Sequence, residues 1–179
     1  MKLSKKLLAI PLVLIVLLSY RTVYLNLVTH SGYYAQYLPH KKSTNPELIF
    51  TLKYLYYLEK PKNSNLDYDY DNDGVNSIIV NEEFSVSGYR SPIVYDNSKY
   101  DRPEDAILTS YRFNEKGVFQ MKRIRDITKN GFQYSKSSES KKEAENYVER
   151  AITPILRVQP KPKLNLQWLF NLIYQRKFE

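Results

Sequence analysis

The sharpest chemical pattern in the sequence is the segment "DYDNDG", which places Asp69, Asp71, Asp73 and Gly74 at alternating and turn positions. Carboxylates at alternate positions followed by a glycine form the first half of a calcium loop of the EF-hand type. The twelfth position of such a loop needs a bidentate glutamate, and here it is Val80. Asp, Asn and Gly are also the residues that a tight turn selects. The sequence therefore favours an Asp-rich hairpin turn, with a metal site at Asp69, Asp71 and Asp73 as the weaker alternative.

Groups that could catalyse a reaction are few. His30 and His40 are the only histidines, both precede the expected folded domain, and the chain has no cysteine. No nucleophile-elbow, phosphate-loop or zinc-protease motif occurs. Chemistry with two carboxylates alone, as in many glycosidases, stays open in principle. The sequence predicts a protein that is not an enzyme and that carries no cofactor.

Charged side chains of opposite sign gather in two other places. An acidic edge is expected at Asp67, Asp69, Asp71 and Asp73, and a basic cluster at Lys122, Arg123 and Arg125. Most charge runs are simply solvated, but two opposed patches on one small domain suit electrostatic docking to a protein partner. The 17 tyrosines are compatible with a binding surface, although tyrosine is also a favoured strand residue. These residues are the candidate partner-binding site.

The net charge of +8 is divided unevenly along the chain. Residues 1–42 carry +6, residues 43–113 carry −5 and residues 114–179 carry +7. The expected folded domain is thus close to neutral, whereas a nucleic-acid-binding protein concentrates Lys and Arg on one face. The pattern argues against nucleic acid as a partner.

The N-terminal segment has the pattern of a targeting sequence. Lys2, Lys5 and Lys6 precede an uncharged apolar run that ends near Tyr20. Its length, about 21 Å as a helix, is short of the roughly 30 Å hydrocarbon core, but no small-x-small cleavage site follows. We expect residues 1–28 to be an N-terminal transmembrane anchor or an uncleaved signal, with the body outside the cell membrane, or exported if the leader is cleaved.

The elements expected after this leader define an α+β fold. A connector over residues 29–44 precedes a single extracytoplasmic α+β domain over residues 45–179, in which an antiparallel β-sheet of about 5–6 strands is flanked by helices mainly on one side. Asn45 is expected to cap the first helix. A second helix is expected to start at Ser140 and to be limited by Pro154. A last helix, capped by Asn165, is expected to dock through Leu169, Leu172 and Ile173.

Four segments together resemble the TipC family of streptococcal immunity proteins. They are "KKLLAIPLVLIVLL" in the leader, "NPELIFTLKYLYYLEK" in the first helix, the "YDYDNDG" turn and the closing "NLQWLFNLIYQRKF". The resemblance implies an immunity protein that binds and occludes a cognate secreted antibacterial toxin outside the membrane. It also implies that the toxin is an LXG-type effector of a type VII secretion system that attacks lipid II.

Other functions stay open at this stage. The main alternative is an envelope-associated accessory protein that binds anionic polymer or lipid through its basic regions. A calcium-regulated module and an unrecognised hydrolase are further alternatives.

Overall fold

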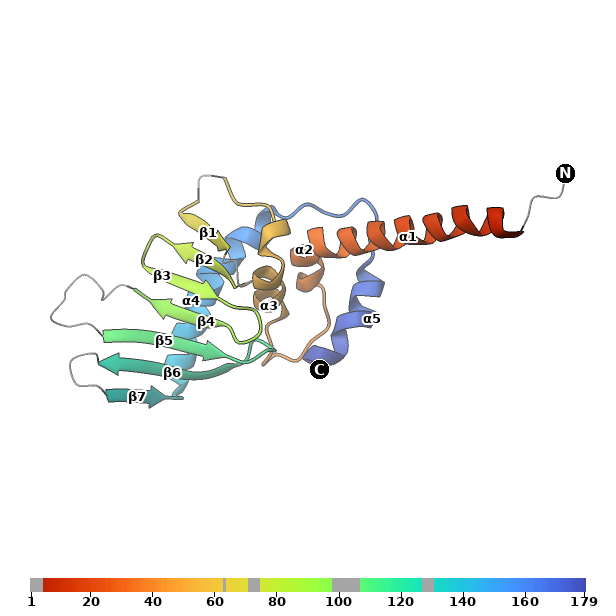
Figure 1. The fold of residues 1–179 in the computed structure, drawn as a ribbon. Helices are drawn as coiled ribbons and strands as arrows, with labels where there is room; N and C mark the ends of the chain where they lie inside the picture. The colour runs from red at the N-terminus through yellow and green to blue at the C-terminus, as the bar shows by residue number, and fades with distance from the viewer. Residues whose placement is uncertain (1–4, 63, 71–74, 98–106, 127–130) are drawn as a thin grey trace.

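The computed structural model describes residues 5–62, 64–70, 75–97, 107–126 and 131–179, with side chains from Leu17 onward. It shows an α+β fold in which helices flank one antiparallel sheet (Figure 1). The helical elements are α1 (Lys5–Thr29), α2 (Ser31–Gln36), α3 (Pro46–Lys53), the short 3₁₀ turn η1 (Leu55–Tyr57), α4 (Ser138–Val158) and α5 (Gln167–Phe178). The strands are β1 (Leu66–Tyr70), β2 (Asn76–Val80), β3 (Phe84–Ser87), β4 (Ile93–Asp96), β5 (Ile107–Phe113), β6 (Phe119–Asp126) and β7 (Gly131–Ser135).

The sheet is an antiparallel meander whose strands lie in sequence order from β1 to β7. The described residues thus form seven strands, so the expected number of five to six was too low. The reason is that each short alternating run pairs with the run before it, including the four-residue strands β3 and β4. The antiparallel meander predicted for the last three runs is confirmed and extends across the whole sheet.

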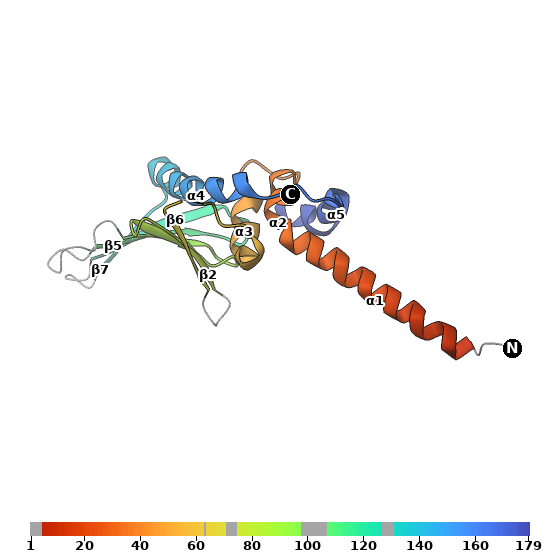
Figure 2. The same cartoon turned by 90° about the horizontal axis from the view of Figure 1, so that it is seen from above.

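Helix α4 packs across one face of the sheet (Figure 2). Ser137 caps it by accepting a hydrogen bond from the Ser140 backbone N–H at 3.1 Å, so the predicted start at Ser140 was late. Pro154 lies inside the helix, and the prediction that it would limit the helix was wrong. Packing explains this, because Ile155 and Leu156 continue the buried stripe beyond the proline and offset its cost of about 3 kcal/mol.

A second hydrophobic cluster lies beside the first and contains no strand residue. It joins the end of α1 to α2, α3 and α5, with Tyr34, Phe50, Phe170 and Phe178 at its centre. Helix α3 separates the two clusters, since Leu48 packs toward the sheet and Phe50 toward the helices. Residues 29–44, expected to be a connector, contain α2 and contribute buried side chains to this cluster.

Helix α1 projects away from the rest of the molecule (Figures 1 and 2). Within the part of the chain that the structure describes, no helix combines the length and the apolar character needed to cross a membrane. The side chains of residues 1–16, which contain most of the expected anchor, lie outside the described residues.

Candidate functional site

The face of the sheet opposite α4 is the candidate functional surface, and we call it the open face. Side chains alternate between the two faces of a strand, and every fully buried strand residue described here lies on the α4 side. No described helix covers the other side (Figure 2). The open face consists of Asp67, Asp69, Ser77, Ile79, Ser85, Ser87, Ile93, Tyr95, Leu108, Ser110, Arg112, Met121, Arg123, Arg125, Phe132 and Tyr134.

The strand register arranges the open face in rows that cross all the strands. One row runs through Asp67, Ile79, Ser85, Tyr95, Ser110, Arg123 and Tyr134, each paired with the next. The row is acidic at the β1 edge, small or apolar in the middle, and basic with an aromatic ring at the β7 edge. Among the predicted site residues, Asp67 and Arg123 thus share one face and lie toward its opposite ends.

The acidic end of the open face is formed by Asp67 and Asp69 on β1. Both carboxylates are exposed, and Asp67 Oδ1 accepts a hydrogen bond from Lys60 Nζ at 2.8 Å. The other two predicted acids, Asp71 and Asp73, lie outside the described residues. Among the residues that are described, no group of His, Asp and Glu is arranged to hold a metal ion, and the predicted calcium alternative also depends on Asp71 and Asp73.

The basic end of the open face is a layer of guanidinium groups and aromatic rings on β6 and β7. The Arg123 guanidinium lies 4.0 Å from the centroid of the Phe132 ring and that of Arg125 lies 5.6 Å from it. A guanidinium that stacks on an aromatic ring lies parallel to the ring, and the N–H donors at its edge stay available for hydrogen bonds. Arg123 Nε is buried and has no hydrogen-bond partner among the described residues, while Tyr134 beside it is 62% exposed. This end of the sheet could present several N–H donors to an acidic partner.

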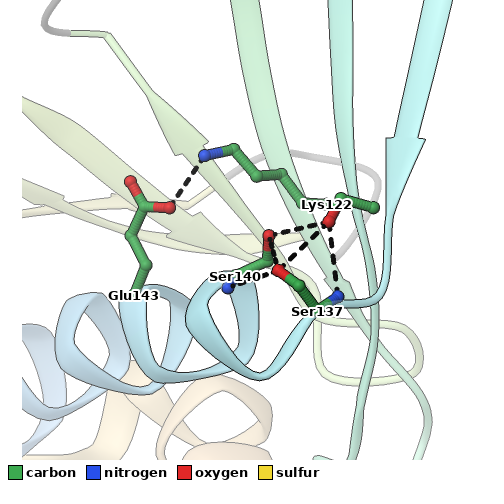
Figure 3. A network of polar contacts seen from close by, with 5 residues as sticks. Lys122, Ser137, Ser140 and Glu143 are labelled. Atoms are coloured by element: carbon green, nitrogen blue, oxygen red, sulfur yellow. Dashed lines mark hydrogen bonds and ion pairs between the residues drawn. The ribbon is translucent and has the colours of Figure 1, made fainter.

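Lys122 does not belong to this surface, although the sequence placed it in the same cluster. Its side chain points to the α4 side, where Nζ donates to Glu143 Oε2 at 2.8 Å (Figure 3). It is only 19% exposed and its Nζ lies 5.2 Å from the centroid of the buried Tyr111 ring. Burial, followed by the Glu143 carboxylate, raises the pKa of Tyr111. Lys122 therefore joins β6 to α4 and has a structural role.

The start of α4 reinforces this junction. Ser137 and Ser140 exchange hydrogen bonds there (Figure 3). The hydroxyl oxygen of Ser135, at the end of β7, lies 3.0 Å from that of Ser140. These contacts fix the last strand to the helix. The pairing of β7 with β6 places Tyr134 opposite Arg123 and Phe132 opposite Arg125.

Arg112 on β5 was not among the predicted site residues. It pairs with Met121 and, with Met121, Arg123, Tyr134 and Lys136, lines a shallow depression of about 510 Å³ on the open face. The alternation of β5 was the signal that could have placed Arg112 beside Arg123, once β5 and β6 were known to pair in this register.

The histidines do not form a catalytic group with the acids of the sheet. His30 lies at the start of α2, and His40, in the segment between α2 and α3, has Nδ1 2.7 Å from the Leu38 carbonyl oxygen. Comparison of the chain with protein-family models, with curated proteins and with solved structures finds no match. The open face is thus described by its geometry alone: a broad surface that no described helix covers, with an acidic end and a basic, aromatic end.

Proposed function

We propose that the protein is an immunity protein, which binds a cognate secreted antibacterial toxin outside the cell membrane and occludes the active site of that toxin. The observation that carries the proposal is the open face, a sheet surface without a covering helix in the described chain, with charges of opposite sign at its two ends. The resemblance of four segments to the TipC family supports the same function. It extends the proposal to a lipid II-targeting toxin of type VII secretion and to a membrane-anchored, extracytoplasmic location.

The dimensions of the open face suit a protein partner. Six spacings between neighbouring strands of about 4.8 Å make the sheet about 29 Å wide. Strands of about five residues are about 17 Å long, so the face has about 500 Å² of projected area. One partner in a standard interface contributes about 800 Å², which such a face supplies in large part. A surface of this size can cover the mouth of an active site.

The composition of the open face also suits recognition by a protein. Exposed Tyr95, Phe132 and Tyr134 offer rigid contact area, and Arg123 and Arg125 offer donors that are already held by stacking. Aromatic and arginine side chains of this kind dominate the free energy of protein interfaces. The acid and base at opposite ends would select the orientation of the partner.

The proposal is tested with the full chain in mild detergent as bait and the secreted proteins of the producing strain as prey, at low and at high salt. We expect one secreted protein to be retained at high salt, and its toxicity to be lost when the bait is present. The double variant Arg123→Glu with Arg125→Glu is expected to weaken binding by about tenfold or more.

Lys122→Gln is the matched control, since it changes the neighbouring residue on the opposite face of the same strand. It should leave toxin binding unchanged. Equal loss of binding in the control and in the double variant would contradict the assignment of the open face. Failure to retain any neutralised toxin would contradict the immunity function itself.

A second candidate function is binding of an anionic envelope polymer, which the arginines around the depression at Arg112 favour. The acidic end at Asp67 and Asp69 opposes it, because a polyanion is repelled there. The two functions differ in their response to salt. Polyanion binding falls steeply as salt rises, whereas a packed protein interface keeps most of its affinity. Capture of polymer alone, and only at low salt, would favour this second function.

A further inference from the structure

Helix α5 has apolar side chains on two opposite sides. Phe170 and Phe178 recur at helical spacing on the inner side and are fully buried in the helical cluster. Trp168 and Leu172, one helical turn apart, lie on the outer side, where they are 66% and 71% exposed, and Ile173 is 50% exposed. A helix with water on its outer side normally has polar residues there. Leu172 and Ile173, which were predicted to dock the helix, are exposed instead.

The start of α5 is attached to the end of α1. Asn26 Nδ2 on α1 donates to the Leu164 carbonyl oxygen at 3.2 Å, and the Tyr34 hydroxyl donates to Asn26 Oδ1 at 2.7 Å. The Leu166 N–H in turn donates to the Tyr34 hydroxyl at 3.0 Å. Figures 1 and 2 both show α5 beside the part of α1 that is nearest to the sheet domain. The two helices therefore hold their outer surfaces in a fixed relation.

Helix α1 also has exposed apolar side chains on the part that lies beyond this junction. Leu17, Leu18, Tyr20 and Tyr24 are exposed along it. Eight residues separate Leu18 from Asn26, about 12 Å along the helix axis and less along a membrane normal if the helix tilts. Leu164, just before α5, is also exposed. Exposed apolar side chains of α1 thus lie within about 12 Å of the residue that joins α1 to the start of α5.

The charges around α5 are those of a surface that meets anionic lipid. Residues 157–179 contain five basic side chains and one carboxylate, that of Glu179. Four of them lie near the apolar side: Arg157, Lys161 and Lys163 precede the helix, and Arg176 lies in its last turn. Lys177 lies toward the inner side, with Nζ 5.5 Å from the centroid of the buried Phe178 ring. Tryptophan favours the headgroup region, and Lys and Arg extend their charged ends toward lipid phosphates there.

We propose that the outer side of α5, formed by Leu164, Trp168, Leu172 and Ile173, docks on the surface of an anionic lipid bilayer. This inference rests on the proposed membrane location and goes beyond toxin binding. An anionic bilayer that contains α1 fits both the exposed apolar side chains of α1 near the junction and the positive charge around α5. Contact through α5 in addition to α1 fixes the orientation of the sheet domain on the membrane. The open face is then presented in one direction instead of rotating freely about α1.

Trp168 is the only tryptophan of the chain, so its fluorescence reports on this surface directly. The full chain is reconstituted into vesicles of phosphatidylglycerol and phosphatidylcholine, with or without lipid brominated near the headgroup end of the acyl chains. We expect the emission of Trp168 to shift to shorter wavelength than in detergent-free buffer with urea. We also expect at least about twofold quenching by the brominated lipid, as for a side chain in the interfacial layer.

Two variants sharpen the test. Leu172→Glu places a charge on the outer side, where a 71% exposed residue has little packing to lose, and should expose Trp168 to iodide in the water. Tyr134→Glu places the same charge on the similarly exposed open face and should leave the quenching of Trp168 unchanged. Circular dichroism checks that both variants keep the secondary structure of the parent chain.

Each other outcome overturns the inference. A chain that floats with the vesicles while Trp168 is insensitive to brominated lipid has its outer α5 side in water. Shielding of Trp168 that depends on protein density and not on bromination means that a second copy covers it. A chain that does not float refutes the membrane location as well. Neutralisation of toxin by Leu172→Glu is measured separately and should be retained, so a failure here is distinguishable from a failure of the immunity function.

Discussion

Gly117 offers the most direct test of how the sheet is joined to the first helix of the body. It lies in the turn between β5 and β6 with φ +75°, and a Cβ there would lie 2.7 Å from the Asn45 carbonyl oxygen and 2.8 Å from the Asn45 Cβ. Asn45 caps α3, since its Oδ1 accepts from the Leu48 N–H at 2.8 Å. Its own N–H donates to the Lys116 carbonyl oxygen at 2.8 Å. The added methyl group would therefore meet backbone that is already held at both sides.

The stability that Gly117→Ala is expected to lose has two parts, and the same substitution at a second glycine, Gly88, separates them. Gly88 has the same φ of +75°, but a Cβ there would find its nearest neighbour, the Ser91 carbonyl oxygen, at 3.8 Å. Gly88→Ala should therefore cost only the conformational part, about 1–2 kcal/mol. Gly117→Ala should add the cost of overpacking, about 1–3 kcal/mol, for a total of about 2–5 kcal/mol. The difference between the two variants measures the close approach of the turn to α3.

The assay is unfolding of the full chain by urea in a mild nonionic detergent, followed by circular dichroism. Equal slopes of the free energy against urea for the parent and both variants would allow a direct comparison of stabilities. If the two variants lose the same stability within about 0.5 kcal/mol, the turn relaxes without cost and the reasoning from the Asn45 contact is refuted.

Three further predictions concern the two hydrophobic clusters and the surface. Phe170→Ala should cost about 3–5 kcal/mol in the same urea assay, because the ring is fully buried and its centroid lies 4.8 Å from that of Phe50; a loss below about 1 kcal/mol would show that the helical cluster adds little. Burial, ahead of the nearby Asp96, raises the pKa of Tyr147 to about 12, and burial, ahead of the hydrogen bond with Tyr54, raises that of Tyr174 to about 12. Since an unfolded tyrosine titrates near pH 10, both phenols contribute stability that is complete below about pH 10 and is lost as the pH rises to 12. Burial raises the pKa of Tyr68 and Tyr111 still further, so these two tyrosines titrate later in the parent chain and in the variant alike. Absorbance at 295 nm should show two fewer tyrosines titrating near pH 12 in the double variant Tyr147→Phe with Tyr174→Phe than in the parent chain; an unchanged titration would refute the assignment. Glu83→Gln should cost less than about 1 kcal/mol, although Glu83 Oε2 lies 2.6 Å from Arg150 Nη2, because both side chains are about half exposed; a loss of several kcal/mol would contradict this.

Local sequence patterns were sufficient for most of the secondary structure. The period of two placed the strand runs, and the stripe at Ala144, Val148 and Ile152 placed the main helix. The cap at Asn45 was predicted and is confirmed, since its side chain accepts a hydrogen bond from the third residue of the helix. These features depend on neighbours within about four residues, which the sequence contains in full.

The candidate site was predictable in part. The acids of β1 and the arginines of β6 were identified, but Lys122 was grouped with Arg123 although adjacent strand residues point to opposite faces. Alternation was enough to separate these two residues. It was not enough to show which of the two faces is covered, because that depends on where α4 packs.

The choices left to the tertiary structure are those in which the local pattern allows two answers. Pro154 lacks a backbone N–H and should therefore end a helix, yet α4 continues to Val158 because Ile155 is buried. Helix α5 is apolar on both sides, so its sequence alone could not tell whether Phe170 or Leu172 would be buried. Phe170 is the buried residue because its ring packs against the rings of Tyr34 and Phe50. Burial follows the partner that is available, and that partner comes from distant parts of the chain.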